Sequence, residues 1–221
     1  MSISYVEITN IFSKLKKIKN YDQLVENSIK IDGFNSSLIC ASDFYKNNKK
    51  IIDLLSNWRR DADTFHNKFS VTAEGTEKWY QELLLNVDDR ILFFITHGNS
   101  FIGHLGFANL SVDDSSCSIE LDNVIRGVKN IYPGLMSAAC NALMNFAFEK
   151  LHMQKVILKT LLSNDHAINF YKNIGYKEYD RLPLKKVKDL LNFDHKIINI
   201  NDKMIHPDDY FVCMEIKHKN D

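Results

Sequence analysis

The stretch 117–176 holds two consecutive strand–loop–helix patterns, and these restrict the possible folds of the chain more than any other segment. The strand patterns lie at 118–126 and 155–162, and polar residues and a helical pattern follow each of them. The second helical pattern starts at Asn164 and stops at Gly175, as a helix with an N-cap side chain and a C-terminal glycine would. Short strands alternating with helices predict an α/β core.

The first strand pattern carries two carboxylates on one face. Alternation gives one face of Ser118, Glu120, Asp122 and Val124 and another of Ile119, Leu121, Asn123 and Ile125. Two interpretations of the acidic face stay open. It is either solvated, as charged faces usually are, or it lines a cleft in which Glu120 or Asp122 accepts a proton.

The loop 128–136 contains Pro133-Gly134 and leads into an amphipathic helical pattern. The free N–H groups of a helix start attract anions such as phosphate, and glycine lets a ligand approach closely. Pro-Gly before a helix is also an ordinary turn signal. Phosphate binding and a simple turn are therefore both compatible with this loop.

The second helical pattern places Asn164, Ala167 and Tyr171 on one stripe, at i, i+3 and i+7. This spacing alone is typical of a packed tyrosine. The whole pattern at 164–176, N-x-x-A-x-x-F-Y-x-x-x-G-Y, resembles the terminal motif of the GCN5-related N-acetyltransferase superfamily. The preceding loop and helix resemble that superfamily's pyrophosphate-binding segment, and the likeness covers roughly residues 37–186.

The resemblance implies a fold of the α/β (α+β) class, with a mixed, mostly antiparallel central sheet that is splayed around acetyl-CoA and flanked by helices. It also implies direct transfer of the acetyl group from acetyl-CoA, the co-substrate, to a primary amine. Glu120 matches the strand carboxylate that acts as a base, often through water. Tyr171 would protonate the departing thiolate, and Asn164 would hydrogen-bond the pantetheine arm.

Backbone groups complete the coenzyme site that the resemblance implies. The pantetheine arm would pair with Val124, Ile125 and Arg126, and the pyrophosphate would be held by the N–H groups of Gly134, Leu135, Met136 and Ser137. The loop departs from the usual pattern Arg/Gln-x-x-Gly-x-Gly/Ala, because Ile131 and Met136 occupy the first and last positions. Arg126 lies five residues before Ile131, so we expect a longer loop than usual.

The acceptor side is expected upstream, where two helical patterns at 51–65 and 76–85 precede a hairpin at 91–110. In the resembling family these two helices cover the acceptor site. Candidate acceptor contacts are Trp58, Arg59, Arg60, Lys78, His104 and Asp122. Trp58 is otherwise a core residue, and His104 is either a satisfied strand histidine or a substrate contact or general base.

The acceptor itself is indicated by a weaker likeness. Helix-borne Trp58-Arg59, a T-x-x-W pattern, an I-G-H strand, the V-I-R-G strand end and a late R-x-P-L segment resemble the branch that acts on nucleotide-linked amino sugars in bacterial surface-polysaccharide biosynthesis. Arg59, Arg60 and Lys78 would then meet the nucleotide's pyrophosphate, since cationic side chains pair well with phosphate. The alternatives are a ribosomal-protein-type acetyltransferase for protein N-termini and a non-catalytic acyl-CoA-binding module.

The length of 221 residues predicts one domain with an extension. We expect a helical extension at 1–36 and the acetyltransferase domain at 37–221, with a short helix or an irregular excursion at 187–208 between two final strands that pair. A formal net charge of +0 gives no electrostatic basis for binding nucleic acid or an anionic membrane.

The four cysteines are scattered and form no C-x-x-C pair, and the first residues lack a signal-peptide pattern. We therefore expect a reduced, cytoplasmic protein. No metal site is expected, because the histidines and carboxylates lack ligand spacing. The sequence leaves the oligomeric state open, with a homodimer among the alternatives.

Overall fold

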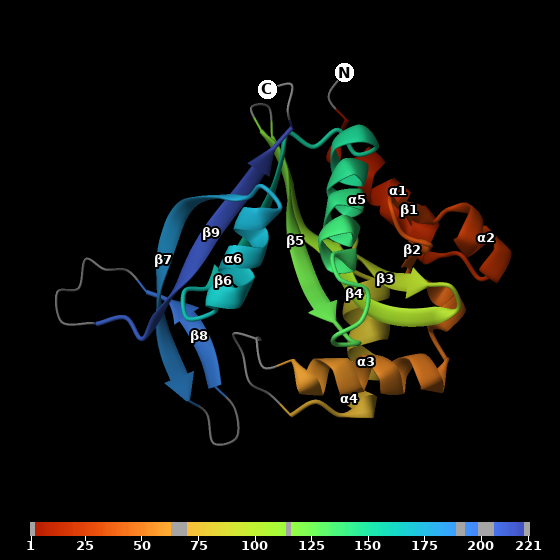
Figure 1. Cartoon of the computed structure of the whole chain (residues 1–221), viewed down its shortest axis with the longest axis horizontal. Helices are drawn as coiled ribbons and strands as arrows, with labels where there is room; N and C mark the ends of the chain where they lie inside the picture. Colours follow the sequence, from red (N-terminus) through yellow and green to blue (C-terminus); the bar gives the residue numbers. More distant parts are fainter. Residues whose placement is uncertain (1–2, 63–69, 114–115, 189–192, 199–205, 219–221) are drawn as a thin grey trace.

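The computed structural model describes residues 3–62, 70–113, 116–188, 193–198 and 206–218. Figure 1 shows a twisted sheet with helices on both sides. The helices are α1 Tyr5–Lys16, α2 Tyr21–Glu26, η1 Asp43–Tyr45, α3 Lys49–Asp61, α4 Ala73–Lys78, η2 Trp79–Leu85, α5 Leu135–Glu149 and α6 Asp165–Asn173. The strands are β1 Ile29–Ile31, β2 Ser36–Cys40, β3 Ile91–His97, β4 Ser100–Val112, β5 Cys117–Arg126, β6 Lys155–Leu161, β7 Lys177–Lys188, β8 Phe193–Ile197 and β9 Asp209–Lys217.

The described strands form one sheet in the order β1-β2-β3-β4-β5-β6-β9-β7-β8. Neighbouring strands in it are antiparallel except β5 and β6, which run parallel. The expected mixed, mostly antiparallel sheet is therefore confirmed. The predicted pairing of the last two strands is also present, between β7 and β9.

Strands β5 and β6 pair only over a short stretch, from Ser118–Lys155 to Glu120–Ile157. Both strands continue beyond this point, to Arg126 and to Leu161. Figure 1 shows the two halves of the sheet diverging there, with α5 and α6 on either side of the opening. The sheet is thus splayed, and the edge of β5 facing β6 has free backbone groups beyond Glu120 within the described part of the chain.

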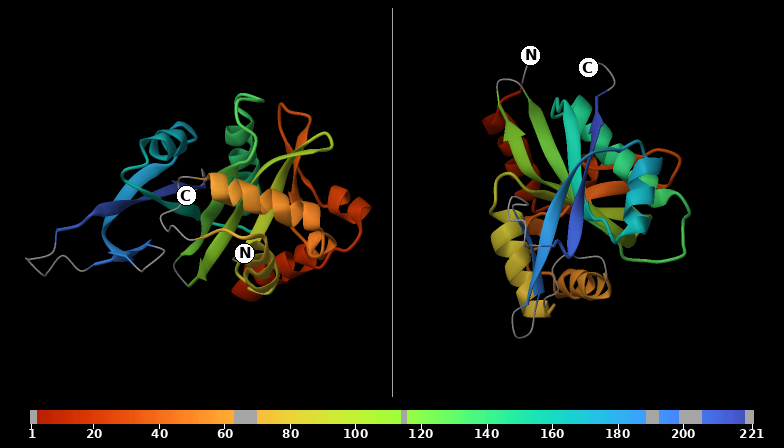
Figure 2. Two further views of the ribbon diagram at one scale, coloured as in Figure 1. Left: turned by 90° about the horizontal axis from the view of Figure 1, so that it is seen from below. Right: turned by 90° about the vertical axis from the view of Figure 1, so that its left-hand side faces the viewer.

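The core lies between the sheet and the helices on its two faces. Helix α5 presents Leu135, Ala139, Leu143 and Ala147 to the core on one face, and α1 presents Ile8 and Phe12 on the other. The left view of Figure 2 shows α1 and α5 on opposite sides of the sheet. Helix α1 therefore packs into the same core as the strands, and the division expected at residue 36 stays a prediction.

Two expected elements differ from those observed. The helix expected at 76–85 begins earlier, at Ala73, and its second half is the π-helix η2. The excursion at 187–208 contains the strand β8, which pairs with β7. The prediction of a helix or irregular structure was wrong for this part. Its largely polar sequence shows no clear strand pattern, and the strand forms because β7 supplies hydrogen-bond partners. Residues 63–69, 189–192 and 199–205 of the expected elements lie outside the described residues.

Candidate active site

The point where β5 and β6 separate brings Glu120 to the apex of the opening. Residues paired across a sheet share a face, so Ile119, Val156 and Ile216 lie together on one side. Gly175, at the end of α6, lies against the side chain of Ile216. Glu120 therefore faces the opposite side of the sheet from α6, while the opening connects the two sides.

Two asparagines with positive φ interrupt the β4–β5 ladder on either side of this apex. Asn109 in β4 has φ 52° and Asn123 in β5 has φ 53°, a conformation that asparagine tolerates better than most residues. The pairing register shifts at both positions. These are β-bulges, in which one strand contributes an extra residue.

Because of the bulge at Asn123, the residues at the end of β5 face differently from the prediction. Asp122 pairs with Gly106, whereas Ile125 pairs with His104, so three steps along β5 match two along β4. Strict alternation therefore fails after Asp122, and Ile125 rather than Val124 shares the face of the carboxylates. The extra residue is the physical reason, because each added residue reverses the facing of those that follow.

The carboxylate of Glu120 receives two hydrogen bonds on the same oxygen. Asn109 Nδ2 lies 2.9 Å from Glu120 Oε2, and Lys159 Nζ lies 3.0 Å from it. The Glu120 side chain is 13% exposed and that of Lys159 is 32% exposed, so water reaches the ion pair mainly from the lysine side. Among the described residues Oε1 has no such donor.

Asp122, the second carboxylate, also receives two hydrogen bonds on one oxygen. Arg90 Nη1 lies 3.1 Å from Asp122 Oδ2, and Asn123 Nδ2 lies 2.6 Å from the same oxygen. Asp122 therefore links Asn123 of the bulge to Arg90, the residue directly before β3. Asp122 is thus placed to stabilise the site's backbone, on the same strand face as Glu120.

His104 is completely buried in β4, beside the same bulge. Its Nδ1 lies 2.7 Å from the backbone oxygen of Asn123, and because a carbonyl only accepts, Nδ1 carries the proton. The lone pair is therefore on Nε2, which is buried and has no hydrogen-bond partner among the described residues. Burial lowers the pKa of His104 to about 4, the bond to Asn123 opposes this, and the charge of Arg59 adds to it.

The neutral imidazole of His104 has a clear consequence for catalysis. A completely buried group with a pKa of about 4 takes a proton poorly from an alkylammonium ion. His104 and Glu120 lie on neighbouring strands and on the same sheet face, as expected. With its proton on Nδ1, His104 offers only the acceptor Nε2 to a ligand.

Trp58 of α3 packs against the end of β5 and close to His104. It is buried, and its ring centre lies 6.0 Å from that of the histidine. A Cβ atom at Gly127 would lie 2.0 Å from Trp58 Cε2, so only glycine allows this contact. Trp58 therefore fixes α3 to the residue that follows β5.

The three cationic acceptor candidates are in different surroundings. Arg59 is buried, with Nη1 3.5 Å from Thr76 Oγ1 and its guanidinium 4.4 Å from the ring centre of Trp79. Burial lowers its pKa. Arg60 and Lys78 are exposed; Arg60 binds Asn57 of its own helix, and Lys78 pairs with Glu82 of η2.

On the α6 side, the cap expected at Asn164 is confirmed. Its Oδ1 accepts a hydrogen bond from Ala167 N at 3.1 Å, and Gly175 ends the helix region with φ 102°. Tyr171 projects from α6 into a buried environment that raises its pKa, and Asp122 adds to the rise. Tyr171 thus stays protonated at neutral pH and lies within electrostatic range of β5, across the opening.

The loop before α5 ends in Gly134, the N-cap, with φ 82°. Leu135 N already donates to Tyr132 O at 3.1 Å, so that amide has a partner within the protein. Met136 and Ser137 follow in the first turn and are half-buried, as is Val124, whereas Ile125 is buried and the side chain of Arg126 is exposed. The first turn of a helix of this length suits an anion.

Sequence reasoning missed the residues that surround the carboxylates. These are Arg90, Asn109, Asn123 and Lys159. Asparagine within an otherwise regular strand pattern was the one available signal for the bulges, because asparagine is disfavoured in strands. Nothing local indicates which cations lie opposite the carboxylates.

Comparison with known proteins is consistent with this geometry. A family model described as an acetyltransferase (GNAT) domain matches residues 48–177, more than half of the chain. The chain belongs to the GNAT acetyltransferase family. It is therefore an acyl-CoA-dependent N-acetyltransferase that uses acetyl-CoA, and the superfamily resemblance seen in the sequence is confirmed.

Solved structures share the fold at low sequence identity. A probable GNAT acetyltransferase from Chromobacterium violaceum superposes with a TM-score of 0.60 at 15% identity, covering 87% of this chain and 86% of that chain. A point mutant of spermidine N-acetyltransferase SpeG from Vibrio cholerae gives 0.59 at 13% identity over 83% and 94%. Campylobacter jejuni N-acetyltransferase PseH, in complex with acetyl coenzyme A, gives 0.53 at 17% identity over 83% and 99%. A search of curated proteins gave no match.

Two further findings concern the described residues. None of their helices has the length and apolar character needed to cross a bilayer. Within the same residues, no cluster of His, Cys, Asp and Glu is arranged to hold a metal ion.

Proposed function

We propose that this acetyltransferase acts on the primary amine of a nucleotide-linked amino sugar, of the kind used in bacterial surface-polysaccharide biosynthesis. One observation carries the proposal: four of the five segments with the branch-like patterns pack together, while the fifth, R-x-P-L, lies in β7. Trp58 contacts Gly127 after the V-I-R-G strand end and lies beside His104 of the I-G-H strand. Arg59 contacts Thr76 and Trp79 of the T-x-x-W pattern.

The acceptor amine would approach from the face of the sheet that carries Glu120. The carboxylate, through Oε1 or a water molecule, takes a proton from the ammonium group, and the amine nitrogen then attacks the thioester carbonyl. A backbone N–H near Val124 stabilises the oxyanion. As the carbon–sulfur bond breaks, the thiolate leaves toward α6 and takes a proton from Tyr171. The amide nitrogen loses its surplus proton, which passes through water to the tyrosinate.

The coenzyme is suited to the opening between β5 and β6. The unpaired edge of β5 beyond Glu120 offers backbone groups to an amide-containing chain such as pantetheine, as an exposed strand edge does for any extended partner. Asn164 lies at the start of α6 on the other side of this opening, and its Nδ2 is a donor suited to a pantetheine carbonyl. Gly134 and the first turn of α5 would hold the pyrophosphate.

His104 and the exposed cations divide the acceptor's recognition between them. The neutral Nε2 of His104 would accept a hydrogen bond from the acceptor after a side-chain adjustment opens its buried face. Arg60 and Lys78 are exposed and available to the nucleotide's diphosphate, whereas Arg59 is packed within the helices and supports Trp79. Asp122 orders the bulge beneath the acceptor.

The test is thermal unfolding with acetyl-CoA, followed by UDP and dTDP, each in the presence of the coenzyme. A ligand at 100 times its Kd stabilises the folded state by about 2.7 kcal/mol, which raises the melting temperature. We expect a rise with acetyl-CoA and a further rise with one nucleotide, which would identify the carrier. The nucleotide response should weaken in Arg60→Ala and Lys78→Ala, and it should persist in Lys14→Ala, an exposed lysine on α1.

Other outcomes would contradict the proposal in different ways. A response to acetyl-CoA without either nucleotide would favour a peptide N-terminus or a small amine as the acceptor. Acetylation of a basic peptide in the same preparation would establish the protein N-terminal alternative. Coenzyme binding without any transfer to amines would leave the binding-module alternative.

A further inference from the structure

The loop that joins β5 to α5 has an unusual backbone. Asn130, Tyr132 and Gly134 all have positive φ, at 60°, 50° and 82°. For a residue other than glycine this conformation costs about 1 kcal/mol or more. A loop with two such residues needs contacts from outside its own backbone to keep one conformation.

Arg126, the last residue of β5, provides such contacts. Its Nε donates to the carbonyl of Val128 at 3.2 Å, and its Nη2 donates to the carbonyl of Ile131. One planar guanidinium therefore binds two carbonyls of the loop, a geometry that a lysine ammonium cannot reproduce. The side chain is directed back over the loop rather than away from the protein.

The other end of the loop is tied to the neighbouring strands. The ring of Tyr132 stacks on His97 of β3, with ring centres 3.9 Å apart, and His97 Nδ1 lies 2.8 Å from Ser36 Oγ of β2. At the first end of the loop, next to β5, Val128 N donates to Ile102 O of β4 at 2.9 Å. With both ends fixed, the contacts of Arg126 decide how the peptide groups between them are turned.

The planarity of the peptide bond gives this orientation a chemical meaning. In a trans peptide, the C=O and the N–H of the next residue point in opposite directions. Since the carbonyls of Val128 and Ile131 point toward the guanidinium, the N–H groups of Lys129 and Tyr132 point away from it. The loop thus turns acceptors toward the cation and donors toward its other side, the polarity needed to bind an anion.

We propose that Arg126 is a positioning residue for the coenzyme's pyrophosphate, holding the loop with the N–H groups of Lys129 and Tyr132 available to the phosphates beside the start of α5. This inference rests on the coenzyme site proposed above. It gives the longer loop a function, because the loop adds two N–H donors to those of the first turn of α5. Arg126 acts through the loop backbone and does not itself contact phosphate.

Binding measurements without an acceptor test the idea. Isothermal titration calorimetry would compare CoA, dephospho-CoA, which keeps the diphosphate, and pantetheine, which lacks it. Loss of a charge-assisted hydrogen bond predicts about tenfold weaker binding of CoA and dephospho-CoA to Arg126→Ala, with pantetheine unchanged. Arg126→Lys should lose nearly as much, because it keeps the charge but not the fork.

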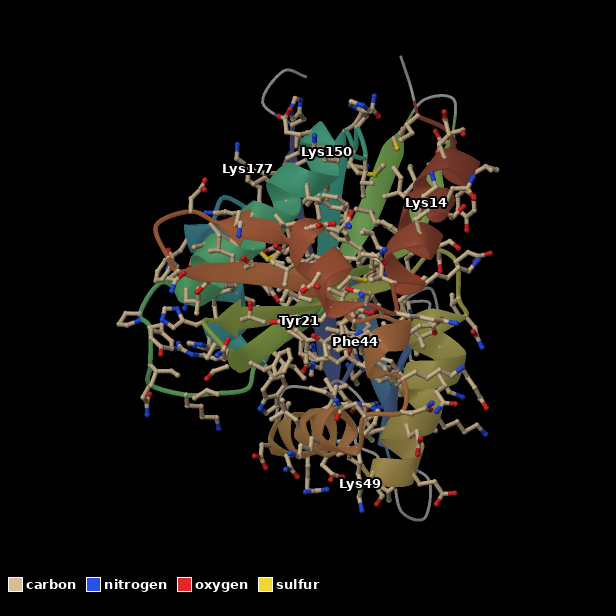
Figure 3. The ribbon with its side chains drawn as sticks, turned by 90° about the vertical axis from the view of Figure 1, so that its right-hand side faces the viewer. Lys14, Tyr21, Phe44, Lys49, Lys150 and Lys177 are labelled. Atoms are coloured by element: carbon tan, nitrogen blue, oxygen red, sulfur yellow. The ribbon has the colours of Figure 1, made fainter. Side chains whose placement is uncertain are left out.

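Lys150→Ala is the matched control, since it removes one positive charge from the exposed far end of α5 (Figure 3). It should bind all three probes like the wild type. Amide hydrogen exchange of the ligand-free protein gives an independent result. Exchange of the 128–132 amides should rise in both Arg126 variants, while exchange in α5 and α6 stays at the wild-type level.

Failure of the inference and failure of the coenzyme site are distinguishable. If wild-type protein binds CoA no better than pantetheine, the proposed pyrophosphate site is wrong and the inference falls with it. If wild-type protein prefers CoA but Arg126→Lys retains that preference, Arg126 contacts phosphate directly and the positioning role is wrong. Unchanged loop exchange in Arg126→Ala would also overturn the positioning role.

Discussion

Acidification should destabilise this protein through His104, and the effect can be isolated. The side chain is completely buried, its Nδ1–H is bound to the carbonyl of Asn123, and Nε2 has no partner among the described residues. Burial lowers its pKa from 6.5 to about 4. Between these values the unfolded chain binds a proton at His104 and the folded protein does not, so stability falls as the pH falls.

The magnitude follows from the two pKa values. At about 1.4 kcal/mol per pH unit, the full range from 6.5 to about 4 corresponds to about 3 kcal/mol of unfolding free energy. Most of this loss should be complete by pH 4.5, and below about pH 4 it should level off, because both states are then protonated. The charge of Arg59 acts in the same direction as burial, and the hydrogen bond to Asn123 acts against it.

The assay is urea unfolding of wild type and His104→Gln between pH 4.5 and 7.5. Glutamine does not titrate, and its amide can still donate to Asn123. Because the other seven of the eight histidines are present in both proteins, the difference between the two pH profiles reports His104. We expect that difference to change by about 2–3 kcal/mol across the range. Parallel profiles would refute the buried, neutral imidazole and restore His104 as a candidate base.

Three further outcomes are expected. Tyr171→Phe should lower kcat by about 100-fold or more with little change in the Kd for acetyl-CoA, and lost coenzyme binding at full rate would contradict its acid role. Gly127→Ala should destabilise the fold by about 1–3 kcal/mol, because a Cβ would lie 2.0 Å from Trp58 Cε2; an unchanged melting temperature would show that Trp58 can move aside. Asn109→Ala should be about 1 kcal/mol less stable than Asn109→Gly, since glycine adopts the positive φ without strain, and both should alter the pH–rate profile through the lost donor to Glu120. Equal stability of these two variants would contradict the bulge conformation.

Much of the catalytic region was predictable because its signals are local. The strand expected at 118–126 is β5 at Cys117–Arg126, and the helix expected after Asn164 is α6. Side-chain periodicity, a capping asparagine and a terminal glycine act within a few residues of each other. Such signals do not depend on contacts with distant parts of the chain.

The strand β8 and the facing of Ile125 were not predictable in this way. Strand β8 exists because β7 pairs with it, and its own sequence has little strand character. Ile125 turns toward the carboxylates because Asn123 adds a residue to β5. Both features depend on a neighbouring strand that lies elsewhere in the sequence.

By itself, the sequence determined the order of helices and strands around the catalytic segment and the motif that identifies the family. Only the tertiary structure decided the surroundings of the reactive groups. Glu120 meets Asn109 and Lys159, which are 11 and 39 residues away in the chain, and His104 is neutral because it is buried beside a bulge that supplies its carbonyl partner. The reason is physical: contacts between strands depend on their register, and two bulges change that register without altering any local periodicity.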